Sequence, residues 1–598
     1  MHLQNHPIPT DLTNRPTDLR PIPPPRQQNE FTLRKAYTIL DPIKIQNSVA
    51  KELNKAFTKW QSLKLIPRSQ IEPDAVTLPS QWIVKEKLDK TVSSRVVMNG
   101  KMQPPHTYSD TYASTSDPTH RAFVLATALA DAAHRNKTLI TFSGDIEAAF
   151  INNNPLPRSS TGGTQLLTKL PADLPQPYSN ALAEIVGAHY GLKQSNNIYD
   201  QDLLGRLTSH DYTRCPSSPY TLQKTSPTDP LDKLTVSFHV DDFEGCTTCP
   251  SLYAEFQSII TERYGPTEFH SPSKGICGQT LELNDDGSIT LHYGPYIANM
   301  LQRIGMDNVP PALSPDIEGL FEPSTDPTPL SAAATAEFRT VNGELIFILP
   351  LRHDIKKTVS FILTKSEAPD NSDYLKQLHL LRYLKGTPTL GPTFSSDKSD
   401  FPNGVEIHSA SDMAHNVYKE DGRSHGAYTL TVGKVGAKTA PFLSFSSKEK
   451  GVSLSPAEGE YVTLSRTCKP LLHYRQFATD LGYPQLNPSI MLEDNASAIK
   501  LTTTPIIPSK SRHIDLKHHH VRWAYQTNQV KPQHQGTHDI VPDAMTKHVG
   551  PSRFLFFRHQ VFQPRSKLIR IVSRPGSKPP PFFPLSTHII VTPPSPSL

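Results

Sequence analysis

The stretch VSFHVDDFEG (residues 236–245) places two adjacent carboxylates directly after an apolar, β-prone run. Such a pair repels itself and is costly to bury without a compensating cation. Another Asp-Asp pair, at 285–286 in LNDDGSITL, precedes a Gly between two alternating runs and is typical of a hairpin turn. No Gly or Pro adjoins the pair in VSFHVDDFEG. This stretch is therefore either an ordinary turn or part of a metal site, and its partners decide between the two.

Asp145 is the first candidate partner. It follows the β-prone segment TLITFSG and precedes IEAAFIN, a pattern that predicts a strand leading into a helix. One carboxylate at a strand end and a pair on a later hairpin are the set that holds two divalent ions about 3.5–4 Å apart for phosphoryl transfer. Taken alone, Asp145 is better explained as a helix cap. Taken with Asp241 and Asp242, it is a candidate metal ligand.

The composition describes a chain with several hydrophobic cores. Its 598 residues are enough for roughly three or four domains of ordinary size. No apolar run approaches the roughly 18 residues of a membrane span, and the first residues lack a signal-peptide core, so we expect an intracellular protein. The net charge is only +5. Any contact with nucleic acid must therefore come from a local basic groove rather than from a global field.

Prolines divide the chain into segments. The 57 prolines, about twice the usual share, gather in residues 1–30, 309–334 and 573–598. The two ends are predicted to be disordered, and the middle stretch is predicted to be a tether. Residues 123–136 have helical spacing. In the last part, VEIHSAS, AYTLTVG and PSIMLEDN favour strands and residues 458–476 favour a helix.

Beyond these patterns, the chain resembles the reverse transcriptase and RNase H portion of the Pol polyprotein of copia-type LTR retrotransposons. The resemblance covers residues 80–563 and rests on motifs that follow one another in family order. Those of the first part are WIVK (82–85), SSRVVMNGK (93–101), GDIEAAFIN (144–152), YGLKQSNNIY (190–199), FHVDDF (238–243), FRTVNGELIF (338–347), RHDI (352–355) and RYLKGT (382–387). Those of the last part are LSPAEGEYVTLS (454–465), LEDNASAIKL (492–501), SKSRHIDLKHHHVRW (509–523) and THDIVPDAMTK (537–547).

The resemblance implies an α+β fold, with a right-hand polymerase of fingers, palm and thumb followed by an RNase H-like α/β domain and flanked by disordered Pro-rich tails. The implied segments are a disordered N-terminal segment at 1–45, reverse transcriptase fingers and palm at 75–308, the Pro-rich linker at 309–334, a helical thumb or connection segment at 335–400, the RNase H-like domain at 401–563 and a basic, then Pro-rich tail at 564–598.

In the polymerase part, the resemblance makes Asp145, Asp241 and Asp242 the carboxylates that bind two Mg²⁺ ions. Phe150 falls where such polymerases keep an aromatic steric gate against the 2′-hydroxyl of ribonucleotides, although core packing also explains an aromatic residue there. Gln194 matches a glutamine near the incoming nucleotide. Arg95 lies in the fingers segment, where a guanidinium suits phosphate.

In the last part, Glu460, Asp494 and Asp543 match three of the four RNase H carboxylates, whose site also uses two metal ions. The family's opening motif, Ser-Asp-Ala-Asp, corresponds here to Ser409-Ala410-Ser411-Asp412. The first carboxylate of that motif, which we take to be the catalytic one, is therefore alanine. We expect RNase H activity to be lost unless Asp412 substitutes as a metal ligand.

The implied function is that of an RNA-directed DNA polymerase, a nucleotidyltransferase. Its partners would be RNA and DNA template-primer, RNA–DNA hybrid and deoxynucleoside triphosphates, and it would not bind a membrane. It would work in cytoplasmic particles that later enter the nucleus. The alternative is an inactive transposon remnant that at most binds nucleic acid. Ala410 favours the remnant, whereas the intact first carboxylate set argues against it. A third interpretation, an unrelated two-domain hydrolase, ignores the order of the motifs.

Overall fold

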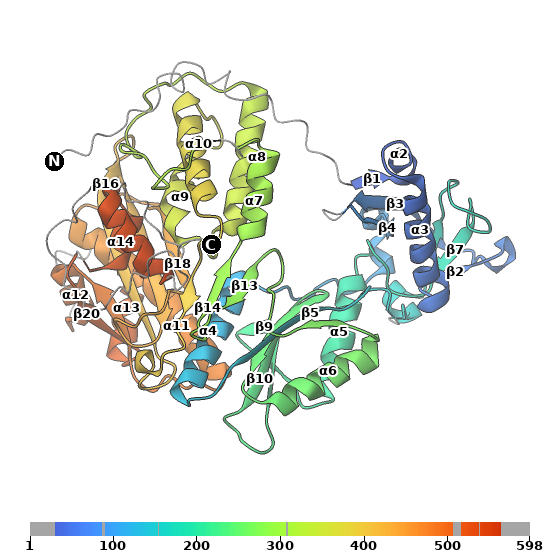
Figure 1. The fold of residues 1–598 in the computed structure, drawn as a ribbon, viewed down its shortest axis with the longest axis horizontal. Coiled ribbons are helices and arrows are strands. Elements are labelled where there is room, and N and C mark those ends of the chain that lie inside the picture. Colours follow the sequence, from blue (N-terminus) through green and yellow to red (C-terminus); the bar gives the residue numbers. More distant parts are fainter. Residues whose placement is uncertain are drawn as a thin grey trace, which may run out of the picture. The chain divides into compact units, whose positions relative to one another are not determined.

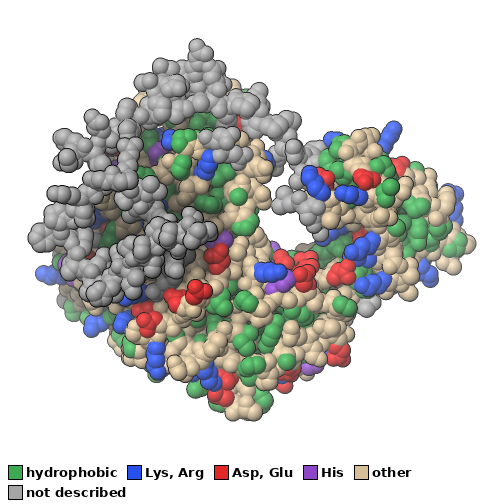
Figure 2. Space-filling model, in the orientation of Figure 1, with side chains coloured by type: hydrophobic (Ala, Val, Ile, Leu, Met, Phe, Trp, Pro, Cys, Tyr) green, Lys and Arg blue, Asp and Glu red, His purple; other side chains and the backbone are tan. Residues whose placement is uncertain are grey.

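The computed structural model describes residues 30–86, 90–152, 155–306, 309–505, 516–537 and 539–563 (Figure 1). Residues 1–29 of the predicted disordered segment 1–45, and the whole predicted tail at 564–598, lie outside these ranges. The described residues form a mixed α+β fold with four sheets. None of the helices in this part of the chain is long and apolar enough to cross a membrane. Charged side chains of both signs are interspersed over the face shown in Figure 2.

The N-terminal sheet has the strand order β1-β3-β6-β7-β2, with β4 paired to β3. Its strands are β1 (Glu30–Thr32), β2 (Leu63–Leu65), β3 (Val76–Glu86), β4 (Val92–Met98), β6 (Leu166–Lys169) and β7 (Leu182–Ile185), and the preceding helices are α2 (Leu33–Ala36) and α3 (Pro42–Leu53). The predicted disorder of residues 1–45 is therefore wrong from residue 30 onward. In α3, Asp41 caps the backbone N–H of Ile43, and Ile45, Val49 and Leu53 recur every four residues on one buried face.

The central sheet has the order β12-β5-β11-β10-β9-β8. Its strands are β5 (Ile140–Asp145), β8 (Thr213–Cys215), β9 (Ser218–Thr225), β10 (Lys233–His239), β11 (Asp242–Thr247) and β12 (Glu268–His270). The helices around it are α4 (Pro118–His134), α5 (Ser195–Thr208) and α6 (Pro250–Tyr264), of which α5 and α6 are visible beside the sheet in Figure 1. The helix predicted at 123–136 is confirmed as α4, which buries Phe123 and Leu129.

The helix predicted after Asp145 does not form. Residues 147–151 form turns, in which the backbone N–H groups of Ile151 and Asn152 both donate to the carbonyl of Ala148. Ala148 has a φ of 56°, which a helix cannot accommodate. The Asn152 side-chain amide also donates to the Tyr264 carbonyl at 2.8 Å, so a contact distant in the sequence fixes this turn.

A short sheet and four helices follow. The strands are β13 (Thr280–Leu283), β14 (Ile289–His292) and β15 (Thr393–Phe394), and the helices are α7 (Gly294–Arg303), α8 (Ala332–Ile348), α9 (Lys356–Thr364) and α10 (Asn371–Gly386). The hairpin turn predicted at 285–286 is confirmed between β13 and β14, where the Asp286 carboxylate accepts the backbone N–H of Ser288 at 3.0 Å.

The Pro-rich linker at 309–334 is packed against other elements rather than free, so its interpretation as a tether is wrong. The carboxylate of Asp316 is 2% exposed and forms ion pairs with Lys357 at 3.0 Å and His548 at 2.8 Å. Sequence composition could not reveal this because both partners lie far along the chain. The predicted segment boundaries at 335 and 401 stay predictions.

The C-terminal sheet has the order β18-β17-β16-β19-β20, in which β19 runs parallel to β16 and to β20. Its strands are β16 (Ile407–Tyr418), β17 (Arg423–Val432), β18 (Leu443–Lys448), β19 (Ser489–Glu493) and β20 (Val530–His534), with helices α11 (Pro456–Asp480), α12 (Ala496–Thr503), α13 (His520–Gln526) and α14 (Pro551–Phe562). The three predicted strands and the helix predicted at 458–476 are confirmed as β16, β17, β19 and α11. Ser455 caps α11 by accepting the backbone N–H of Glu458.

Candidate functional site

The hairpin between β10 and β11 presents the Asp-Asp pair with which the sequence analysis began. His239 and Asp242 are the last paired residues of the two strands, so Val240 and Asp241 form the turn. Val240 has a φ of 59°, an unfavourable conformation for a β-branched residue and one found where other contacts hold a chain in place. The stretch VSFHVDDFEG is therefore a turn that also presents two carboxylates, and the two interpretations of its sequence are compatible.

The neighbouring strand brings Asp145 to the same place. Asp242 of β11 and Asp145 of β5 are directly opposite one another in antiparallel register, and the backbone N–H of Ile146 donates to the Asp241 carbonyl at 3.0 Å. Gly144 permits this pairing, because a Cβ there would lie 2.3 Å from the Phe243 ring. The three carboxylates predicted from sequence thus gather at one end of the central sheet.

The electrostatics of this end disfavour three free carboxylates. Burial, with the charges of Asp241 and Asp145 added to it, raises the pKa of Asp242 to about 6. Burial and then the charge of Asp241 raise the pKa of Asp145, and the Arg95 guanidinium opposes this shift. A carboxylate pKa raised by burial and by neighbouring negative charges means that the ionised form is costly here unless a cation compensates it. Oxygen donors that repel one another in this way fit a hard divalent cation such as Mg²⁺.

Two of the three predicted nucleotide-contacting residues meet at Tyr190. Phe150 packs edge-on against the Tyr190 ring with centroids 5.8 Å apart, and the Arg95 guanidinium lies 5.1 Å from the centroid of the same ring. Gln194 has other partners. It is 1% exposed, its side-chain oxygen accepts the Gln103 amide at 2.8 Å, and its own amide donates to the Thr107 carbonyl at 3.4 Å. The sequence analysis did not single out Tyr190, although it begins the motif YGLKQ.

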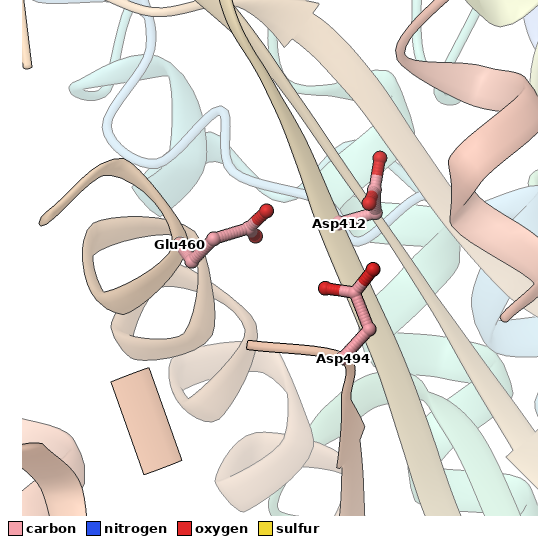
Figure 3. A group of neighbouring side chains, drawn as sticks. All are labelled: Asp412, Glu460 and Asp494. Atoms are coloured by element: carbon pink, nitrogen blue, oxygen red, sulfur yellow. The ribbon is translucent and has the colours of Figure 1, made fainter. Parts of the chain in front are cut away.

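The C-terminal sheet carries a second carboxylate group. Asp412 lies on β16, Glu460 on α11 and Asp494 just after β19, and one oxygen from each lies within 4.8 Å of the others. In Figure 3 the Glu460 side chain points from its helix toward the two aspartates. Among the described residues, this is the one group of three potential metal ligands that is so close. The carboxylates of the central sheet are therefore more widely spaced than this group.

This second group is also short of positive charge. Burial raises the pKa of Asp412 to about 6, and burial together with the charge of Glu493 holds the pKa of Glu460 far above its usual range. One oxygen of Glu460 is buried without a hydrogen-bond partner. Glu493, which sequence analysis missed, is fully buried and accepts the Ser411 hydroxyl at 2.9 Å. Its position just before Asp494 was its only sequence signal.

The interpretation of Ala410 as a lost metal ligand stays a prediction, and the geometry favours Asp412 as the substitute ligand. Ala410 lies opposite Leu492 in the register of β16 and β19 and packs in a small apolar cluster with Leu492 and Ile540. Asp412, two residues further along β16, joins Glu460 and Asp494 instead. Asp543 is outside that group of three: it lies in the short helix η10 (Val541–Met545) and forms ion pairs with Lys547 and Arg553.

The comparisons with known proteins found distant relatives. No protein-family model matches the chain. The chain is 24% identical over 543 residues to the retrovirus-related Pol polyprotein from transposon RE1 of Arabidopsis thaliana, which covers 88% of the chain and 34% of the relative. The chain is also 24% identical over 502 residues to the Pol polyprotein from transposon RE2 of the same plant, a match that covers 82% of the chain and 32% of the relative. It is 23% identical over 373 residues to the Pol polyprotein from transposon TNT 1-94 of Nicotiana tabacum, a match that covers 61% of the chain and 27% of the relative.

The chain is a distant homologue of copia-type Pol polyproteins. It spans about a third of the length of the curated relatives that it matches. Among solved structures, it is similar to a foamy viral protease-reverse transcriptase in complex with double-stranded DNA. The TM-score is 0.46 at 12% identity, and the match covers 86% of this chain and 72% of the other.

Proposed function

We propose that this chain is an RNA-directed DNA polymerase of a copia-type retrotransposon, built as a right-hand polymerase with a C-terminal RNase H-like domain. The observation that carries this proposal is the register of Asp145 opposite Asp242, with Asp241 in the adjoining turn. Its homologues are Pol polyproteins of transposons, which is the second support. The test is Mg²⁺-dependent addition of deoxynucleotides to a primer annealed to RNA, and a folded protein that adds none contradicts the proposal.

The residues of the central sheet fit two Mg²⁺ ions. Asp145, Asp241 and Asp242 would hold them, and ions bound there would activate the primer 3′-hydroxyl and stabilise the leaving oxygen of the triphosphate. Arg95 lies close enough to Asp145 to affect its pKa, so its guanidinium would contact the triphosphate beside the carboxylates. Gln194 would act indirectly, since its amide is bonded to Gln103. Primer-template and deoxynucleoside triphosphates are the proposed partners.

Replacing Phe150 with Val should weaken the discrimination against ribonucleotides. The Phe150 ring is held between Tyr190 and Tyr199, so a smaller side chain leaves room for a 2′-hydroxyl beside it. We expect the preference for deoxynucleotides, measured as the ratio of kcat/KM values, to fall about 10- to 100-fold. Phe347→Val, which changes an exposed phenylalanine of α8, is the control. An unchanged ratio in Phe150→Val would assign Phe150 to packing alone.

The pH dependence of Mg²⁺ binding should report the buried carboxylates of the proposed metal sites, of which Asp242 is the example in the central sheet. Because its folded pKa is raised to about 6 from 3.8, the folded state binds more protons than the unfolded state between these values. Ionisation of Asp242 therefore lowers stability as pH rises through this window. Mg²⁺ binds the ionised carboxylates, so we expect it to raise Tm more at pH 7.5 than at pH 5. A Tm increase that is equal at both pH values would contradict the assignment.

We propose RNA cleavage in RNA–DNA hybrids as a second activity of the C-terminal domain. The observation that favours it is the close grouping of Asp412, Glu460 and Asp494, with one Glu460 oxygen buried and unpartnered. Metal bound there would activate water for attack on the phosphodiester. In this proposal Asp412 substitutes for the carboxylate that Ala410 lacks, so Ala410 alone does not make the domain an inactive remnant. A folded protein that binds hybrid but neither copies nor cleaves it would return that alternative to first place.

A further inference from the structure

Asp543 is already neutralised by two cations of the chain. Its carboxylate is 2% exposed and forms an ion pair with the Lys547 ammonium, four residues later. A second ion pair joins it to the Arg553 guanidinium, in the first turn of α14, at 2.6 Å. Arg553 is itself held by a bond to the Thr537 carbonyl at 3.2 Å. A buried carboxylate with two cationic partners has little remaining need for a metal ion.

The other three carboxylates, of Asp412, Glu460 and Asp494, are not neutralised by cations of the chain in this way. Asp412 accepts the Thr546 hydroxyl and Asp494 accepts the Thr537 hydroxyl at 2.7 Å. Within the described ranges, no ion pair joins any of the three to Lys or Arg. One oxygen of Glu460, whose residue is 6% exposed, has no hydrogen-bond partner, and the Glu460 side chain points toward the aspartates (Figure 3). These three carboxylates are thus the ones that need a cation supplied from outside.

Lys547 lies where the two sets meet. Its ammonium is paired with Asp543 and is near enough to Asp412 for each to act on the charge of the other. Thr546 links the two segments locally, because it donates its hydroxyl to the Asp412 carboxylate and its backbone N–H to the backbone carbonyl of Asp543. The Lys547 ammonium therefore neutralises Asp543 directly and lowers the negative charge felt at Asp412.

We propose that the site in the C-terminal sheet binds one divalent cation, at Asp412, Glu460 and Asp494, and that Lys547 with Arg553 replaces a second cation by neutralising Asp543. This rests on the proposed nuclease-like function of the same site. Lys547 and Arg553 already bring two positive charges to the single negative charge of Asp543, so that carboxylate gives a second divalent ion no uncompensated charge to bind.

Counting bound Mn²⁺ by electron paramagnetic resonance on the full chain tests this proposal. Ions bound at the central sheet add the same number to every count, so the difference between a variant and wild type reports the C-terminal site alone. The double variant Asp412→Asn/Asp494→Asn should bind one ion fewer than wild type, and Lys547→Met should bind one ion more, because it frees the place beside Asp543. Lys531→Met, on the exposed side of β20, should equal wild type.

The outcomes separate the two proposals. A loss of two ions in Asp412→Asn/Asp494→Asn would overturn the one-ion site while keeping the metal-dependent domain. A loss of none would remove the metal site itself and with it the proposed nuclease function. An unchanged count in a folded Lys547→Met would show that its ammonium does not exclude an ion. If Lys547→Met does not fold, the count of the double variant still decides between one ion and two.

Discussion

Asp241→Asn is expected to abolish primer extension while leaving the fold and the binding of primer-template intact. The carboxylate lies in the turn of the β10–β11 hairpin, where it contributes charge rather than packing. A metal ion stabilises the transition state by several kcal/mol, and each 1.36 kcal/mol is tenfold in rate, so we expect kcat to fall about a thousandfold. The measurement is single-turnover extension beside circular dichroism and a binding titration with labelled primer-template.

The chain supplies a matched control for this substitution. Asp285→Asn changes the other Asp-Asp pair, which also lies in a hairpin turn but is exposed and distant in sequence from the proposed ligands. It should extend primers at the wild-type rate. If Asp241→Asn unfolds the protein, or if both variants lose activity equally, the carboxylate has a structural role and the proposed polymerase site is misplaced.

Glu460→Gln is expected to abolish hybrid cleavage and to stabilise the metal-free protein. Glu460 is buried beside other carboxylates, and its pKa lies far above its usual range, so near pH 7 folding must either protonate it or bury its charge. An amide avoids that cost. We expect the free energy of unfolding in chelator to rise by about 2 kcal/mol at pH 7.5, and cleavage to fall about 100-fold or more with the lost ligand.

The sign of the pH dependence distinguishes this explanation from a general improvement in packing. A carboxylate with a raised folded pKa is protonated in both states at pH 4, so the advantage of Glu460→Gln should disappear there and appear as pH rises. Glu420→Gln, which changes an exposed ion pair with Lys365, should move stability by less than about 1 kcal/mol at either pH. A Glu460→Gln variant that is less stable than wild type at pH 7.5 would contradict the account.

Local pattern predicted those elements whose stabilising contacts repeat along the chain. The apolar spacing of α4 and the strand-like runs of β16, β17 and β19 were sufficient, because each buries one regular face. The segment at 30–53 was missed because its proline-rich surroundings hid the four-residue spacing of Ile45, Val49 and Leu53. The turn after Asp145 was missed because a bond from Asn152 to Tyr264, more than a hundred residues away, fixes it.

Some residues of the candidate sites could likewise be predicted from local sequence, and others could not. Asp145, Asp241 and Asp242 could be found from sequence, since strand ends and hairpins place carboxylates predictably. Asp412 was offered from sequence only as a substitute ligand, because its place in the group depends on how the middle of β16 faces α11 and β19. Lys547 and Arg553 acquire their importance only through the burial of Asp543, which sequence does not show.

The most direct test of the central claim is dTMP incorporation by the purified chain on poly(rA)–oligo(dT) with Mg²⁺, followed on a denaturing gel with EDTA and Asp241→Asn as parallel reactions. The account predicts ladders of extended primer from the wild-type chain and none in either parallel reaction. A wild-type chain that is folded and binds poly(rA)–oligo(dT), yet leaves the primer at its original length, would contradict it.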